Sequence, residues 1–184
     1  MPSNFHWVFN AIRNQQGDLP VTMSSLVVRR HLFESLGGFP LGEPMGEDQD
    51  FLFRAAFAHP IAYDPKVLAF YHLDSDNRAC VRHVPKTECP FSQRLGTLAL
   101  RDSVPEWQKR DIESCRAAHV MHLARRNLQV GDIAAAQILL RHPVCAAKPV
   151  SRAALRLKTG VMWLVRCAKL VVVNQSRLQN LTHE

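Results

Sequence analysis

Three carboxylates fall within four residues of the sequence, at Glu47, Asp48 and Asp50, directly after Gly46. The residues that follow place apolar side chains at helical spacing, which predicts a helix over 47–58 with these acids in its first turn. A helix N-terminus keeps a carboxylate ionised, and a preceding glycine lets a ligand approach closely. An ionised carboxylate held there is suited to act as a general base. The same acids also fit a second interpretation, in which they only cap the helix.

Short elements on either side must position these acids. The pattern predicts a buried strand over 22–29, a short helix over 30–36 stopped by Gly37-Gly38, a proline-containing loop over 39–45, and two strands over 61–63 and 66–72. From residue 88 onward the chain turns helical, with helices predicted over 88–101, 106–130, 132–141 and 151–173. Gly131 and Asp132 are expected as the C-cap and N-cap between two of these helices.

The order of these motifs resembles the acceptor half of family 2 glycosyltransferases, which have the GT-A fold. The run SSLVVRRHLFESLGGFP, a short loop and then GEDQDFLFR are similar to that family's strand, Arg-starting helix, GGF turn and ED pair, over about residues 20–80. The resemblance implies an α/β fold, with a partial GT-A domain (a short mixed sheet with flanking helices) over 1–84 and an α-helical C-terminal region over 85–184. It also implies an inverting enzyme that transfers a sugar from a nucleotide-sugar donor to an acceptor hydroxyl.

The resemblance assigns Asp48 as the catalytic base, which takes the proton of the acceptor hydroxyl. It implies that Glu47 orients the acceptor or the loop and that Gly38 and Phe39 shape the loop over the acceptor pocket. Asp50 and Arg54 complete this acceptor-side set by supporting the helix and the site. Phe39 and Trp7 could also stack on sugar faces, although core packing is the commoner fate of either.

Some members of the family place a metal-binding histidine where His72 stands. The resemblance therefore implies a divalent metal, Mn²⁺ or Mg²⁺, with His72 as a ligand. The alternative is an ordinary histidine at the end of a strand.

Two features of the family have no counterpart in this sequence. Nothing before Pro20 can form its nucleotide-binding β-α-β region or its Asp-x-Asp metal motif, and the triplet Asp74-Ser75-Asp76 follows the base instead of preceding it. The Gln-x-x-Arg-Trp motif of processive synthases is also absent. We therefore expect a non-processive transferase that lacks its nucleotide-binding half, with little or no transfer by this chain alone. The expected partners are that missing N-terminal half and a sugar, lipid-linked or cell-envelope acceptor. The alternative is a non-catalytic helical interaction module, or an inactive remnant of such a transferase.

The composition is that of a folded, basic protein. It has 23 Lys and Arg against 16 Asp and Glu, a formal net charge of +7, and 47% hydrophobic residues. The stretch from Arg141 to Arg177 holds no Asp or Glu. Such a segment favours an anionic membrane surface over nucleic acid, because no nucleic-acid-binding motif accompanies it.

The predicted helix over 151–173 is amphipathic. At about 100° per residue, one face collects the apolar side chains Leu157, Val161, Leu164, Ala168, Val171 and Val172. The other face collects Arg152, Arg156, Lys158, Arg166 and Lys169, with Trp163 near the border. Two interpretations stay open: an interfacial membrane helix, or a helix packed on its own domain with a solvated basic face.

The sequence contains five cysteines, Cys80, Cys89, Cys115, Cys145 and Cys167, widely spaced and without a CxxC pair. This pattern favours free structural thiols in a reducing compartment. The first residues lack the pattern of a signal peptide, and no apolar run approaches the length of a membrane span. We therefore expect a cytoplasmic location, or a peripheral one at the inner face of the membrane.

Overall fold

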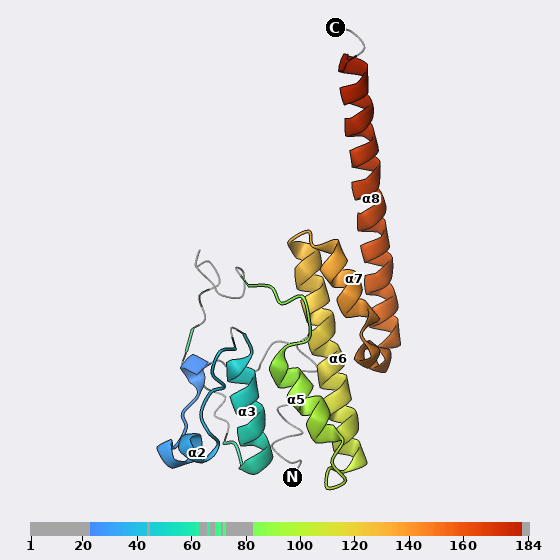
Figure 1. Cartoon of the computed structure of the whole chain (residues 1–184). Helices are drawn as coiled ribbons and strands as arrows, with labels where there is room; N and C mark the ends of the chain where they lie inside the picture. The colour runs from blue at the N-terminus through green and yellow to red at the C-terminus, as the bar shows by residue number, and fades with distance from the viewer. Residues whose placement is uncertain are drawn as a thin grey trace.

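The computed structural model describes residues 23–43, 45–62, 66, 69–70, 72 and 83–181, with side chains through residue 168. Within these ranges the elements are η1 (Met23–Ser25), α2 (Arg30–Ser35), α3 (Glu47–Ala58), α5 (Pro90–Ala99), α6 (Glu106–Gln129), α7 (Ile133–Arg141), η2 (Pro143–Ala147) and α8 (Pro149–Leu181), where η marks a 3-10 helix. Figure 1 shows α2 and α3 on one side of α5 and α6, and α7 and α8 on the other.

The expected α/β fold with a short mixed sheet is wrong, because the described residues form helices and contain no strand. Of the segment 22–29, expected as a buried strand, residues 23–29 are described; they form the 3-10 turn η1 and then irregular backbone, with Val27 97% exposed. A strand is stable only when a neighbouring strand satisfies its backbone groups, and no described segment pairs with this one. Of the strands expected over 61–63 and 66–72, residues 63, 67, 68 and 71 lie outside the described residues, and the described remainder forms no strand.

The predicted helices are confirmed, although some boundaries differ. α3 has the predicted bounds, whereas α8 begins at Pro149 and runs to Leu181, well beyond the expected end at 173. Between α6 and α7, Gly131 has a positive φ of 80°. Asp132 caps α7 by accepting a hydrogen bond of 3.0 Å from the backbone N–H of Ala135. Local signals in the sequence therefore predicted the positions of the helices and of this turn.

The long helix α6 lies at the centre of the core. It packs against α5, α7 and η2, and more lightly against α8. A single cluster of buried apolar side chains joins α3, α5, α6, α7, η2 and α8, and includes Leu52, Phe91, Met121, Leu140 and Leu155. This cluster continues across the position between residues 84 and 85, at which the sequence analysis divides the chain.

The segment before α5 is fastened to the C-terminal end of α6. The buried amide Nδ2 of Asn127 donates to the backbone oxygens of Pro85 and Leu123, both at 2.9 Å. Lys86 adds an ion pair of 2.7 Å with Asp132, at the start of α7. These contacts hold Pro85 and Lys86, which precede α5, against the turn between α6 and α7.

One side of α8 packs against the rest of the chain. Leu155 and Thr159 are buried on this side, and Met162 packs against the core cluster. The helix then continues past the other elements toward the C-terminus, as Figure 1 shows. Within the residues that the structure describes, no helix combines the length and apolar character needed to cross a membrane.

Arginines on the same side of α8 cap neighbouring helices. Arg152 and Arg156 donate to the backbone oxygen of Leu140, at 2.9 and 3.3 Å, near the C-terminal end of α7. Arg166 donates at 3.3 Å to the backbone oxygen of Gly131, which follows α6. Cations stabilise the unsatisfied carbonyls at helix C-termini. One side of α8 therefore packs on the rest of the chain, with arginines on this packed side and not on a solvated one, and binding of α8 to a membrane surface stays a prediction.

Candidate functional site

Gly46 begins the candidate site with a backbone conformation that favours glycine. Its φ is 91°, in the left-handed region, and it is the N-cap residue of α3. A Cβ atom at this position would lie 2.6 Å from Cδ1 of Phe91, whose ring is buried in the core. Both the φ value and the contact require glycine, so the start of α3 is held closely against α5.

Asp48 lies partly buried in the first turn of α3, beside Glu47. Its Oδ1 accepts a hydrogen bond of 2.7 Å from the backbone N–H of Gln49. Burial raises the pKa of Asp48; the Gln49 hydrogen bond offsets part of this effect, and the negative charge of Glu47 raises the pKa again. A raised pKa brings a carboxylate closer to the proton affinity that a general base needs at neutral pH.

Asp50 lies two residues after Asp48, and both of its carboxylate oxygens accept hydrogen bonds. It is buried, and it accepts hydrogen bonds of 2.7 Å from Nε of Arg54 and 2.7 Å from Nε of Arg94. Arg94, in α5, also donates to both carboxylate oxygens of Glu43, at 2.6 and 2.9 Å. Asp50 therefore joins α3 to α5 and to the loop before α3.

Arg54 extends this hydrogen-bond network to the turn at Gly37 and Gly38, which follows α2. Its terminal nitrogens donate to the backbone oxygen of Gly38 at 2.6 Å and to that of Leu36. With Asp50 as its carboxylate partner, Arg54 fixes the turn that leads into Phe39. Asp50 and Arg54 thus join α3 to α5 and to the turn after α2, while their part in an acceptor site stays a prediction.

Three phenylalanine rings pack together beside this turn. The ring centroids of Phe33, Phe39 and Phe51 lie between 5.2 and 5.4 Å apart in edge-on or tilted contacts. Phe39 nevertheless remains 40% exposed. Gly38 has a φ of 63°, and a Cβ there would approach the Phe33 ring to 3.1 Å. Phe39 therefore packs against neighbouring rings, as one sequence interpretation expects, and it also leaves part of its ring exposed to a ligand, as the other requires.

The described residues do not assemble a metal site around His72. The residue is exposed, and the described part of the chain holds no cluster of three or more His, Cys, Asp or Glu side chains that could bind a metal ion. The segment Asp74-Ser75-Asp76 and Trp7 lie outside the described residues. The side chains in the described part of the chain therefore do not fit the divalent metal that the resemblance implies.

A second polar cluster, centred on Glu88, was not anticipated from the sequence. The buried Glu88 carboxylate accepts hydrogen bonds from Oγ of Ser92 at 2.6 Å and from Arg116 at 2.9 and 3.1 Å, with Nε2 of His142 3.3 Å away. A Cβ at Gly96 would lie 2.5 Å from the Arg116 guanidinium, so this helical glycine leaves room for the arginine. Burial alone would raise the pKa of Glu88, but the Arg116 and Ser92 hydrogen bonds outweigh it and lower the pKa.

The four described cysteines are free thiols. Burial raises the pKa of Cys89 to about 11 and that of Cys115 to about 12, and it also raises the pKa of Cys145. Thiols with such values are almost fully protonated at neutral pH. These three cysteines therefore fill the core as structural thiols, in agreement with the interpretation of their spacing.

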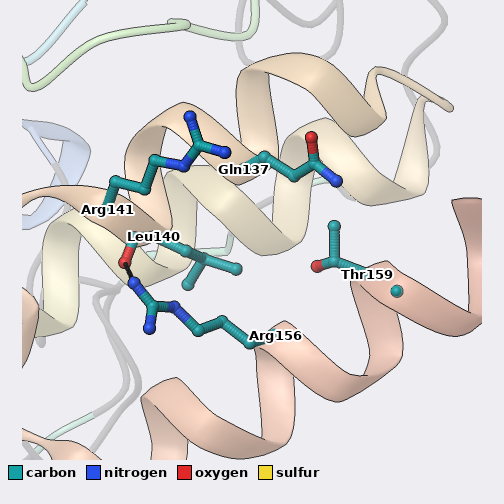
Figure 2. Close-up of a pocket in the computed structure, with 6 residues that line it drawn as sticks. Gln137, Leu140, Arg141, Arg156 and Thr159 are labelled. Atoms are coloured by element: carbon teal, nitrogen blue, oxygen red, sulfur yellow. Dashed lines mark hydrogen bonds between the residues drawn. The ribbon is translucent and has the colours of Figure 1, made fainter.

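An open pocket of about 360 Å³ lies between α7 and α8, away from Asp48. Figure 2 shows Gln137, Leu140 and Arg141 of α7 facing Arg156 and Thr159 of α8 across it. Its polar groups are mainly cationic or neutral, and Arg156 already donates to the backbone of Leu140. The pocket contains no carboxylate that could act as a base.

Comparison of the sequence with protein-family models and with curated proteins, and of the structure with solved structures, finds no match. The function must therefore be argued from the geometry of these residues.

Proposed function

We propose that this chain forms the acceptor-side part of an inverting, non-processive glycosyltransferase site, with Asp48 as the general base. The observation that carries the proposal is the place of Asp48: partly buried, with a raised pKa, at the start of a helix that a left-handed glycine precedes. The resemblance in motif order over about residues 20–80 gives this carboxylate its assigned reaction.

The proposed reaction is a single displacement. The acceptor hydroxyl oxygen attacks the anomeric carbon of the nucleotide sugar and forms the new glycosidic bond, while Asp48 takes the hydroxyl proton. The bond from the anomeric carbon to the nucleoside diphosphate breaks, and its electron pair leaves with the phosphate oxygen. Because the described residues supply no metal site, no step here passes through a metal ion. A positioned general base contributes roughly 10² to 10⁴ in rate.

Contacts between separate segments support this assignment. Arg54 ties the turn at Gly38 to α3, and the ring of Phe39 packs on Phe51 of the same helix, whose first turn carries Glu47 and Asp48. A partly exposed aromatic ring and a partly buried carboxylate carried by one helix and its neighbouring turn suit a sugar ligand, since aromatic rings pack on apolar sugar faces and carboxylates accept hydrogen bonds from hydroxyls. The free thiols of the described cysteines support a reducing compartment, so we place the protein in the cytoplasm or at the inner face of its membrane.

The chain alone is expected to bind an acceptor sugar but no nucleotide sugar. Saturation-transfer NMR against a panel of oligosaccharides and lipid-linked sugars should detect binding on the order of 1 mM for at least one class. Phe39→Ala should weaken that binding by about tenfold, because it removes the stacking ring.

Leu41→Ala is the matched control, since Leu41 is 98% exposed in the same loop. Thermal unfolding of both variants separates lost binding from lost folding. Tight binding of a nucleotide sugar by the chain alone would overturn the expected division between donor and acceptor sides. If no sugar of the panel binds, the helical interaction module becomes the better interpretation.

A further inference from the structure

The outward side of α8 carries a row of apolar side chains. Val150, Leu157, Val161 and Leu164 are 82%, 73%, 53% and 60% exposed. With two exposed alanines they follow the i, i+4, i+7 spacing of a single helix face. We call this surface the α8 row; it consists of Val150, Ala154, Leu157, Val161, Leu164 and Ala168. Single exposed apolar residues are ordinary, but a continuous row of them marks an interaction surface.

The helix cannot turn this row toward the core, because its opposite side is already engaged. Leu155 and Thr159 are buried there, and Arg152 and Arg166 donate to backbone oxygens at the ends of α7 and α6. Figure 1 shows α8 at the edge of the molecule, with α7 on one flank. The α8 row therefore needs a partner from outside the described fold.

We propose that the α8 row binds an anionic phospholipid membrane, with α8 lying in the plane of the interface. Residues 133–183 contain no Asp or Glu and eight basic residues: Arg141, Lys148, Arg152, Arg156, Lys158, Arg166, Lys169 and Arg177. A second copy of the chain would bring two such segments together, and their like charges would repel. An anionic leaflet attracts the same charges, so charge complementarity selects the membrane.

Residues beside the row suit this orientation. Val165 is 51% exposed and lies on the flank of the row, about 60° from Val150, so it widens the apolar surface. Lys158 is exposed next to Leu157, whereas Arg141 and Arg156 lie on the packed side, at the pocket between α7 and α8 (Figure 2). Long cationic side chains can reach lipid phosphates while the apolar row enters the acyl boundary. The inference rests on α8 alone and does not depend on the role proposed for Asp48.

Co-sedimentation of the full chain with vesicles tests the proposal. At low salt the chain should sediment with vesicles in which about a third of the phosphatidylcholine is replaced by phosphatidylglycerol, and much less with pure phosphatidylcholine. Added salt should weaken the binding. The double variant Leu157→Asp/Leu164→Asp should bind the anionic vesicles at least about tenfold more weakly.

A double variant of matched chemistry, Leu41→Asp/Leu100→Asp, serves as the control, because these leucines are 98% and 82% exposed outside α8. It should bind as the unchanged chain does, and thermal unfolding should show both double variants folded. The proposal is overturned if the unchanged chain stays in solution with anionic vesicles, or if the α8 variant binds as well as its control. It is also overturned if ultracentrifugation shows a dimer that the α8 variant abolishes, which would assign the row to a second copy.

Discussion

Replacing Glu88 by alanine is expected to lower the free energy of unfolding by about 3 kcal/mol, because three polar groups lose their shared partner. Ser92, Arg116 and His142 all contact the Glu88 carboxylate. The Arg116 side chain is only 19% exposed, so the variant leaves a largely buried cation without the carboxylate that neutralises it. Urea denaturation followed by circular dichroism measures the difference.

The control for this variant is Glu113→Ala, which removes an exposed carboxylate from the same helix, α6, that carries Arg116. A surface change of this kind should alter stability by no more than about 0.5 kcal/mol. If Glu88→Ala unfolds at the same urea concentration as Glu113→Ala, the cluster adds no net stability to the fold. The prediction would then be wrong.

Acidification is expected to remove about 3 kcal/mol of stability through His119 alone. His119 is buried, its ring stands edge-on to Phe91 at 4.7 Å, and its Nε2 has no hydrogen-bond partner in the described part of the chain. Burial lowers its pKa from 6.5 to about 4, and the charge of His122 contributes in the same direction. The unfolded chain takes up a proton below 6.5, whereas the folded chain does not until about 4, so stability falls across this window.

Urea denaturation at a series of pH values between about 7 and 4 measures this loss. His119→Leu should remove most of the pH dependence in that window, whereas His59→Leu, at an exposed position, should retain it. Glu88 contributes to the pH dependence of stability at lower pH than His119. Because the pKa of Glu88 is lowered in the folded chain, its contribution to the free energy of unfolding is fully present above pH 4.5. This contribution is lost as the pH falls through the pKa that Glu88 has in the folded chain. Identical pH profiles for the unchanged chain and His119→Leu would contradict the assignment to His119.

The sequence predicted helices better than strands for a physical reason. A helix satisfies its backbone groups within one segment, so apolar spacing and a cap such as Gly131-Asp132 are enough to locate it. A strand depends on a partner that may lie anywhere in the chain. The segment 22–29 has the composition of a strand, but no described segment pairs with its described residues, 23–29, which form a 3-10 turn followed by irregular backbone.

The sequence predicted those parts of the candidate site that are neighbours in the chain, but not the contacts between distant segments. Gly46 and Asp48 were found because they are neighbours at the start of a predicted helix. The partner of Asp50 in α5, Arg94, lies 44 residues away, and no sequence signal connected the two. Arg116 lies 28 residues from Glu88 in the sequence. The one sequence feature related to this pair is the glycine at position 96 of α5, which leaves room for the Arg116 guanidinium.

The orientation of α8 shows the same limit. The helical wheel placed Leu157, Val161 and Leu164 together on one face, but it could not decide which face the chain itself would use. Arg152 and Arg166 find helix C-termini on α7 and α6, and these contacts turn the apolar residues outward. Only the tertiary structure contains that information.

The central claim is that Asp48 receives a proton from a bound sugar hydroxyl, and carbon-detected NMR of its carboxyl group tests it most directly. Asp48→Asn assigns the resonance by removing it. We expect a pKa of Asp48 above the ordinary 3.8 in the free protein, and a change in the Asp48 signal when the acceptor sugar is added. A pKa at or below 3.8, with a signal that no sugar of the panel perturbs, would contradict the account.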